Sequence, residues 1–195
     1  MAWNVAQALV LFGSMLLAIW VGITAFQRMS LPGRSWLGWL QIAIAFWCAT
    51  SGLHALLAST PQRIAVSQFQ YIGIMALPVC WLEFAREYSR RPAPARPWLT
   101  WLIPAITVAL AFSNGSHHLL WREFREIPTG EFVRLQYVHG PWFSVAAGYT
   151  YLCLATGTIW MLNAVRHQPE QYRLQSVVLS VEAACDASVA KAPAP

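Results

Sequence analysis

The stretch that decides the fold is residues 5–26, which reads VAQALVLFGSMLLAIWVGITAF and contains no charged residue. An α-helix needs about 20 mostly apolar residues to cross the hydrocarbon core of a bilayer. No basic residue precedes this stretch, whereas a cleaved secretory signal begins with a positively charged region. We therefore expect residues 5–26 to form a retained membrane-spanning helix.

Four further stretches have the same apolar character. They cover residues 36–57, 65–88, 98–113 and 142–165. The stretch 98–113 is short and contains Pro104. A sixth stretch begins at about Leu174 but includes Glu182 and Asp186, and each acid would cost about 2.5–3.5 kcal/mol near the centre of a span. The sequence therefore predicts an all-α, polytopic membrane helix bundle with five transmembrane helices and an incomplete sixth.

The composition agrees with a membrane protein. The chain is 57% hydrophobic and 11% charged, whereas soluble domains carry about 25% charged residues. The basic residues are 12 arginines and Lys191, and the arginines lie between the apolar stretches rather than on one polar face. This distribution favours membrane orientation over nucleic-acid binding, so the lipid bilayer is an expected partner and nucleic acid is not. The four cysteines show no metal-ligand spacing.

The loop charges predict the orientation. The loops after the first, third and fifth stretches hold eight arginines, and those after the second and fourth hold four. Because the loops richer in Lys and Arg stay in the cytoplasm, the N-terminus is expected outside and the C-terminus inside.

Glu83 is the charged residue deepest within the third stretch. It lies about one turn from Arg86 and Glu87, near the predicted cytoplasmic end. An ionisable residue inside a membrane bundle is a candidate signalling or proton-linked switch. An interfacial acid paired with Arg86 explains it equally well, so both interpretations stay open.

Four of the five histidines fall on the predicted outer side: His54, His117, His118 and His139. Imidazoles gathered at one face could bind a metal or haem, or titrate near neutral pH. However, the spacing shows no HxH, HxxxH or Cys-His pattern, and hydrogen bonds to backbone and water explain interfacial histidines more simply. We therefore predict no metal and no cofactor.

The longest loop, residues 114–141, is expected to cover the outer mouth of the bundle. Asn114-Gly115 is a turn signal, and residues 128–130 suggest a second turn between two short strands. A small ligand could bind beneath such a cap. The chain contains no P-loop, GxGxxG, HExxH or GxSxG motif, so no enzymatic activity is expected.

Several motifs together resemble the seven-transmembrane N-terminal region of bacterial sensor histidine kinases. The third stretch, YIGIMALPVCWLEFAREY at 71–88, resembles the third helix of that region. Further similarities are Asn114 with HHLLW at 117–121, GPWF at 140–143 and QYRLQ at 171–175. The resemblance covers about residues 5–175. It implies a membrane sensor or anchor in the inner membrane, normally followed by a cytoplasmic signalling module and a kinase core.

The resemblance is expected to stop after Gln175. We interpret residues 1–175 as a membrane sensor-like domain and residues 176–195 as a divergent C-terminal tail, either a cytoplasmic helix or an end replaced by truncation or frameshift. The chain is expected to lack the kinase core. Its output would then require a separate signalling protein or a homo-oligomer.

The sequence thus predicts a non-enzymatic sensor of a ligand at the outer mouth or within the bilayer. The candidate ligand-binding residues are His54, His117, His118, Trp121, Trp142 and Glu83. Two alternatives remain: a small transporter or metal- or haem-binding membrane protein, and a non-functional truncated fragment.

Overall fold

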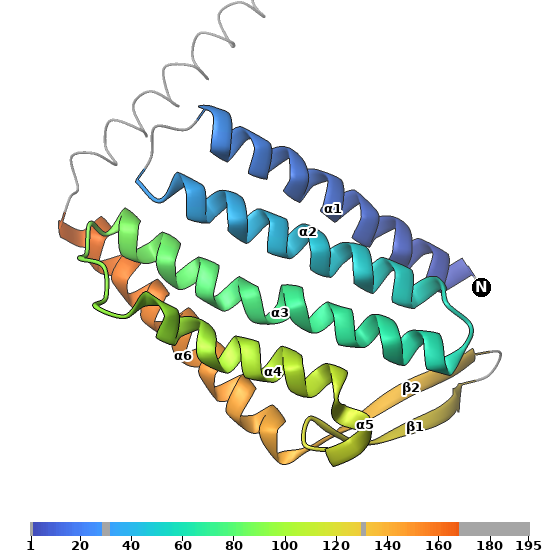
Figure 1. Cartoon of the computed structure of the whole chain (residues 1–195). Helices are drawn as coiled ribbons and strands as arrows, with labels where there is room; N and C mark the ends of the chain where they lie inside the picture. Colours follow the sequence, from blue (N-terminus) through green and yellow to red (C-terminus); the bar gives the residue numbers. More distant parts are fainter. Residues whose placement is uncertain (1, 29–31, 130–131, 168–195) are drawn as a thin grey trace, which may run out of the picture.

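The computed structural model describes residues 2–28, 32–129 and 132–167. In chain order the elements are α1 (Ala2–Arg28), α2 (Arg34–Leu56), α3 (Thr60–Tyr88), the 3₁₀ helix η1 (Pro97–Trp101), α4 (Leu102–Phe112), the single turn α5 (Asn114–His117), β1 (Trp121–Thr129), β2 (Phe132–His139) and α6 (Pro141–His167). The long helices lie side by side, and the β1–β2 hairpin lies at one end of them (Figure 1). The helical membrane bundle expected from the sequence is therefore confirmed.

The number of spanning helices differs from the expectation of five. In the described part of the chain, α1, α2, α3 and α6 are long and apolar enough to cross a membrane, whereas Pro97–Phe112 is a shorter apolar segment. A 3₁₀ turn rises about 2 Å per residue and an α-helix about 1.5 Å. The segment is therefore about 26 Å long, less than the roughly 30 Å hydrocarbon core. The expected incomplete sixth helix, from Leu174 onward, lies outside the described residues.

The outer helices expose their apolar side chains, as a bilayer requires. In α1, Leu9 is 66% exposed and Trp20 is 65% exposed, and in α6 Leu152 is 66% exposed. The buried residues of α1 are small, such as Ala18 and Ala25. Small residues allow membrane helices to approach closely where no hydrophobic effect drives them together.

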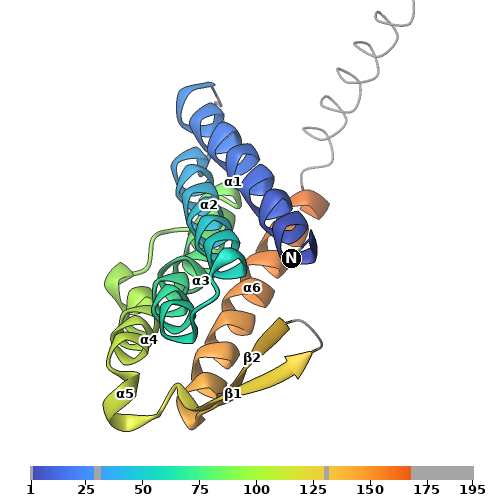
Figure 2. The ribbon, with the colours of Figure 1, turned by 90° about the vertical axis from the view of Figure 1, so that its right-hand side faces the viewer.

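Helix α3 is the centre of the bundle. It packs against α2, α4 and α6, and Figures 1 and 2 show it between α2 on one side and the α4–α6 pair on the other. Gly73 lies against α2, since a Cβ there would be 2.9 Å from the Ala43 carbonyl oxygen. Any larger residue at position 73 would push α2 and α3 apart.

Two prolines begin helices. The third apolar stretch was expected to begin at residue 65, but α3 begins earlier, with Thr60 and Pro61 as its first two residues. Pro141 begins α6 in the same way. Proline is favoured in the first helical turn because an N–H there needs no intrahelical partner.

The long loop forms the expected two strands. β1 and β2 pair antiparallel, with Trp121 opposite His139, Phe124 opposite Tyr137 and Glu126 opposite Leu135. The hairpin, the start of α1 and the α2–α3 connection share one end of the bundle, which we call the hairpin end (Figure 1). The end of α1, the start of α2, the α3–α4 linker and the end of α6 share the other end, which we call the arginine-rich end because it holds Arg28, Arg34, Arg86, Arg90, Arg91, Arg96 and Arg166.

Candidate functional site

The hairpin is anchored to the bundle through Asn114. This side chain is 4% exposed. Its Nδ2 donates to the Trp121 carbonyl oxygen at 2.8 Å, and its Oδ1 accepts from the backbone N–H groups of Leu120 and Trp121, both at 3.0 Å. Leu120 and Trp121 are buried below it. The amide of Asn114 therefore pairs backbone groups that would otherwise be buried without partners.

Gly140 completes the anchor from the other strand. Its N–H donates to the Leu120 carbonyl oxygen at 2.8 Å, and the Trp142 N–H donates to the Leu119 carbonyl oxygen at 3.0 Å. A Cβ at position 140 would lie 2.1 Å from the Leu119 carbonyl oxygen, so only glycine fits. The sequence motifs at 114–121 and 140–143 are thus two halves of one joint.

An aromatic cluster seats the hairpin on α3. The indole of Trp121 has its centroid 5.2 Å from the Tyr71 ring, 5.7 Å from Phe124 and 5.8 Å from Tyr137. Edge-on and tilted arrangements of this kind are the favoured ones for aromatic rings. Because Tyr71 belongs to α3, the cluster couples the hairpin to the central helix.

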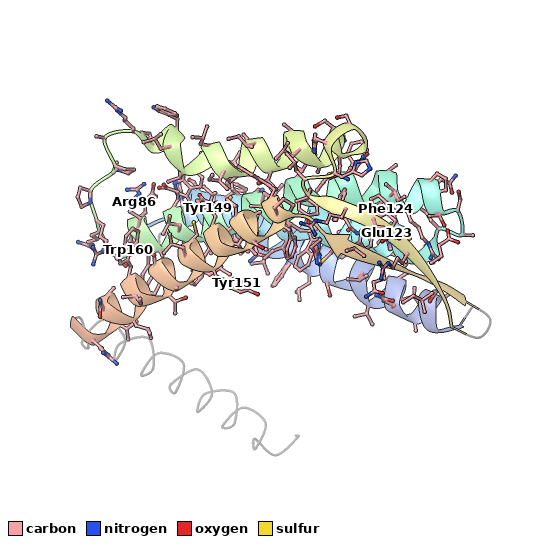
Figure 3. The ribbon with its side chains drawn as sticks, turned by 90° about the horizontal axis from the view of Figure 1, so that it is seen from below. Arg86, Glu123, Phe124, Tyr149, Tyr151 and Trp160 are labelled. Atoms are coloured by element: carbon pink, nitrogen blue, oxygen red, sulfur yellow. The ribbon has the colours of Figure 1, made fainter. Side chains whose placement is uncertain are left out.

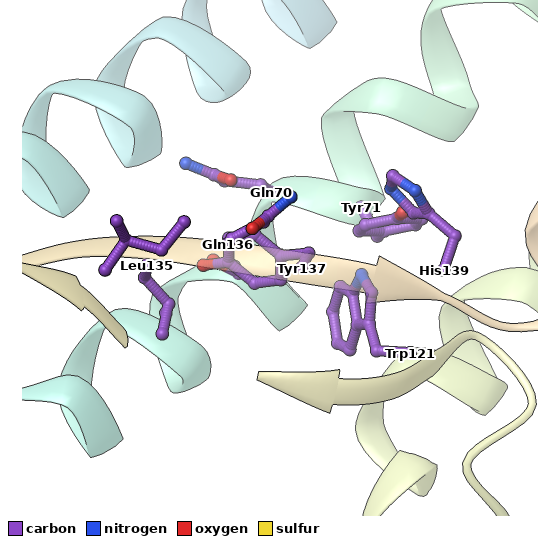
Figure 4. A pocket seen from close by; sticks show the side chains of 9 residues that line it. Gln70, Tyr71, Trp121, Leu135, Gln136, Tyr137 and His139 are labelled. Carbon is purple, nitrogen blue, oxygen red and sulfur yellow. The ribbon is translucent and has the colours of Figure 1, made fainter. Parts of the chain in front are cut away.

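A cavity of about 520 Å³ lies between α3 and the hairpin (Figure 4). Its lining residues are Ser67, Gln70, Tyr71, Trp121, Ile127, Leu135, Gln136, Tyr137 and His139. None of them is Asp, Glu, Lys or Arg. The cavity therefore offers aromatic faces, hydroxyls, amides and the His139 imidazole, and its lining has no carboxylate, ammonium or guanidinium group.

A chain of hydrogen bonds closes the cavity toward α2. The Tyr137 hydroxyl lies 3.0 Å from His54 Nε2 and 2.6 Å from Ser67 Oγ. The Ser67 hydroxyl donates to the Arg63 carbonyl oxygen at 2.9 Å, so Ser67 must accept the proton of Tyr137. Tyr137 then accepts from His54, which places a proton on His54 Nε2. One hydroxyl thus joins β2 to both α2 and α3.

Burial raises the pKa of the Tyr137 phenol above its ordinary value, against the opposing effects of the Ser67 hydrogen bond and the Arg63 charge. Burial therefore disfavours the phenolate and favours the neutral phenol, the form that donates to Ser67.

A second polar cluster lies on α3 at the arginine-rich end. Glu83 is 4% exposed, and its Oε2 lies 2.6 Å from Arg86 Nε. Arg86 Nη2 also lies 3.3 Å from Glu87 Oε1, which accepts from Trp36 Nε1 of α2 at 2.9 Å. Glu83 is therefore a buried carboxylate paired with Arg86. This arrangement is compatible with a signalling switch and with a structural ion pair.

The same cluster reaches the α3–α4 linker and α6. Arg86 Nη1 donates to the Arg91 carbonyl oxygen at 3.3 Å, and the Arg91 guanidinium lies 4.9 Å from the centre of the Trp160 ring. Ser89 Oγ donates to the Trp160 carbonyl oxygen at 3.1 Å. Figure 3 shows Arg86 and Trp160 at one end of the bundle and Glu123 and Phe124 of the hairpin at the other.

Only some of the predicted ligand-binding residues come together. Trp121 lines the cavity, and His54 reaches it through Tyr137. Trp142 packs beside the Trp121 cluster and donates to Thr107 Oγ1 of α4 at 3.0 Å. Glu83 lies at the opposite end of α3. Their roles in binding a ligand remain predictions.

His117 and His118 do not line the cavity. His117 Nδ1 accepts from the Leu119 N–H at 3.1 Å, and its Nε2 lies 3.0 Å from Ser113 Oγ. His118 has a positive φ of 55° and its Nδ1 lies 3.1 Å from the Asn114 carbonyl oxygen. Both side chains therefore bond within the turn that precedes β1.

Most of the residues that form the cavity were not among those predicted from the sequence. Ser67, Gln70 and Tyr71 have the i, i+3, i+4 spacing of one helix face, and Tyr137 and His139 have the alternation of one strand face. These two periodicities are the signal that would have found them. Within the described ranges, no group of three or more His, Cys, Asp or Glu side chains is arranged to hold a metal ion.

Comparison with known families decides the relationship. The family described as the N-terminal 7TM region of histidine kinase matches residues 10–187. The chain belongs to this family. It is accordingly a multi-pass membrane protein of the sensor type used in signal transduction, and the 7TM region is a non-catalytic input domain. The match continues past Gln175, where the sequence analysis expected the resemblance to stop. Searches of curated proteins and of solved structures returned no match.

Proposed function

We propose that the chain is the input region of a bacterial inner-membrane signalling system, which detects a stimulus at the hairpin end and passes it along α3. The observation that supports this most is the continuity of α3 between the two polar sites. Ser67 and Tyr71, in the first half of α3, line the cavity, and Glu83 and Arg86 lie near the end of α3. The distance along the helix from Ser67 to Glu87 is about 30 Å, the thickness of the hydrocarbon core.

The proposed orientation places the hairpin end outside and the arginine-rich end in the cytoplasm. Among the described residues, seven arginines lie at the arginine-rich end and four at the hairpin end. In this orientation the cavity faces the periplasm, and the end of α6 faces any cytoplasmic partner. That partner is a separate signalling protein or another copy of the chain.

The proposed transmission is a change in helix packing at the arginine-rich end. Trp36, Arg91 and Trp160 hold the last turns of α3 against α2, the linker and α6. Packed interfaces change between discrete arrangements, with helix shifts of about 1–2 Å. A small displacement of α3 would therefore be felt by α6, to which α3 is joined at Trp160.

Cysteine labelling in intact cells tests the orientation. Ser116→Cys at the hairpin end and Ala93→Cys in the α3–α4 linker are both at exposed positions. A membrane-impermeant maleimide should label Ser116→Cys in intact cells and Ala93→Cys only after permeabilisation. The opposite result would reverse the proposed direction of signalling. The unaltered chain gives the background from its native cysteines.

Distance measurements across the arginine-rich end test the transmission. Spin labels at Ala93→Cys and Arg166→Cys, in full chain reconstituted in lipid nanodiscs with Cys48 and Cys185 replaced by serine, report the position of α6 relative to the linker. Tyr137→Phe should shift this distance on the order of 2 Å, because it removes the hydrogen bonds that join β2 to His54 of α2 and Ser67 of α3. Ser113→Ala is the matched control, since it removes a hydroxyl at the same end whose hydrogen bonds are to Ala109 of α4 and His117 of α5. An unchanged distance in Tyr137→Phe would contradict the proposed function.

A further inference from the structure

The cavity between α3 and the hairpin is built by two regular patterns that meet. Ser67, Gln70 and Tyr71 form one face of α3, and Leu135, Tyr137 and His139 occur at alternate positions of β2. Figure 4 shows Tyr71, Trp121 and His139 close together at one end of this space, with Leu135 at the other. The volume of about 520 Å³ lies within the usual range of roughly 300–1,000 Å³ for small-molecule sites.

The lining selects against charge. The lining residues include no Asp, Glu, Lys or Arg, and two charged residues of the flanking elements, Arg63 of α3 and Glu126 of β1, have partners of their own. Arg63 Nε donates to the Leu57 carbonyl oxygen at 2.7 Å, and Glu126 accepts from Thr60 at 2.5 Å. An ion entering the cavity would lose part of its hydration without forming an ion pair with an acidic, lysine or arginine side chain of the lining.

The lining favours an aromatic molecule with a polar group. Trp121, Tyr71 and Tyr137 present ring surfaces, and rings prefer to pack edge-on or offset against such surfaces. The amides of Gln70 and Gln136 also line the space, and an amide has two donor hydrogens and an acceptor oxygen, so Gln70 keeps hydrogen-bonding capacity beyond its bond to Ser51 Oγ at 3.3 Å. The Tyr137 hydroxyl, which donates to Ser67, can still accept from a ligand hydroxyl or amide. Ile127, at the edge of the cavity, is 41% exposed, so the space is open to solvent beside β1.

We propose that this cavity is the ligand site of the input region and that its ligand is an uncharged aromatic small molecule carrying a hydroxyl or amide. The assignment rests on the proposed function, because it identifies the stimulus with the occupant of this space. Such a ligand contacts α3 and β2 at once. It therefore acts on the contact between Tyr137 and Ser67 that holds the hairpin against α3.

Reactivity of an introduced cysteine tests the selectivity of the cavity. Gln70→Cys lies in the cavity, and Ser116→Cys on the exposed α5 is the matched control. The probes are benzyl methanethiosulfonate, which is uncharged and aromatic, and two charged methanethiosulfonates with trimethylammonium-ethyl and sulfonatoethyl groups. Each rate is measured by mass spectrometry on the full chain in lipid nanodiscs, with the unaltered chain as background.

The expected result is a preference for the aromatic probe. The ratio of the rate at Gln70→Cys to that at Ser116→Cys should be about tenfold higher for the benzyl reagent than for either charged reagent. Benzamide at millimolar concentration should slow the reaction at Gln70→Cys and leave that at Ser116→Cys unchanged. Equal ratios for the three reagents, or protection at both positions, would overturn the assignment. If Gln70→Cys does not fold, Gln136→Cys on β2 provides the second position.

Benzamide separates this inference from the proposed function. Protein spin-labelled at Ala93→Cys and Arg166→Cys, with Gln70 unaltered, is compared with and without millimolar benzamide by the distance between the two labels. A selective cavity without a distance change contradicts the transmission to α6 and leaves the ligand class standing. A distance change in Tyr137→Phe together with an unselective cavity contradicts the ligand class alone.

Discussion

The two ends of α3 hold their neighbours by different means. At the hairpin end, contacts with α2 and β2 are made by uncharged groups, with Tyr137 bonded to His54 and Ser67 around a cavity. At the arginine-rich end, contacts pass through ions, with Glu83 and Glu87 both within reach of Arg86. The hairpin end contains a cavity whose hydrogen bonds to α2 and α3 join uncharged groups, whereas the arginine-rich end contains ion pairs and packs against Trp36.

This difference has a physical consequence for signalling. Hydrogen bonds between neutral groups have modest net free energies, about 0.5–1.5 kcal/mol each, so a ligand can compete with them. Breaking a buried ion pair by removing one partner costs about 3–5 kcal/mol. The hydrogen bonds at the hairpin end are therefore weak enough for a ligand to replace them. The ion pairs at the arginine-rich end are expected to persist while the helices shift.

The largest expected effect concerns the joint that carries the hairpin. Gly140→Ala would place a Cβ 2.1 Å from the Leu119 carbonyl oxygen, so we expect a loss of stability of about 4 kcal/mol or more as the joint opens. Gly148→Ala in α6 is the matched control, because a Cβ there has nothing within 4 Å, and it should leave stability unchanged or slightly higher. Thermal unfolding in detergent compares them, and similar behaviour of the two variants would show that the joint is not rigid.

The next effect tests the charged end. Arg86→Met leaves the buried Glu83 without its guanidinium partner and should cost about 3 kcal/mol. The double variant Glu83→Gln with Arg86→Met should recover most of that loss, because no uncompensated charge then remains. Arg96→Met in the exposed linker is the control and should change little. A double variant as unstable as Arg86→Met would mean that shape, and not charge, dominates this cluster.

A smaller effect tests the neutral end through the ionisation of Tyr137. Since burial raises the pKa of this phenol above 10, the stability contributed by its neutral form is fully present below pH 10. It is lost as the pH rises through the folded-state pKa. The difference in phenolate absorbance between the unaltered protein and Tyr137→Phe should show a midpoint above 10. A midpoint at or below 10 would place this hydroxyl in water.

The smallest effect is expected on the outer surface of the hairpin. Arg125 Nη2 and Glu123 Oε2 lie 2.9 Å apart, but the two side chains are 60% and 54% exposed. Exposed ion pairs contribute about 0–1 kcal/mol, so Arg125→Ala should change the unfolding free energy by less than about 0.5 kcal/mol. A larger loss in thermal unfolding would indicate that charged contacts also matter at the hairpin end.

Much of the architecture was predictable from local pattern. The apolar stretches gave the helices within a few residues, and the turn near residue 130 gave the two strands, since both signals depend on short-range periodicity. The start of α3 was misplaced because Thr60-Pro61 fits both a turn and a first helical turn. The fourth span was counted as full length because hydropathy does not report the 3₁₀ geometry of Pro97–Trp101.

The candidate site was less predictable. The candidate ligand-binding residues predicted from the sequence were mainly histidines and tryptophans. They included Trp121 and His54 but not Ser67, Gln70 or Tyr137. No local sequence pattern predicts the hydrogen bond between Ser67 of α3 and Tyr137 of β2, because 70 residues separate them along the chain. His117 and His118 were both predicted to bind a ligand, but in the structure both form hydrogen bonds within the turn that contains them.

The sequence by itself determined the solvent, the fold class and the family, because the length of apolar stretches, the distribution of arginines and the spacing of motifs are all properties of the linear chain. Only the tertiary structure decided what the motifs do. Asn114 and Gly140 meet at one joint, Tyr137 bridges α2 and α3, and Arg86 lies among groups from α2, α3 and the linker. Such contacts depend on the packing of distant segments, and packing sets distances that no local pattern contains.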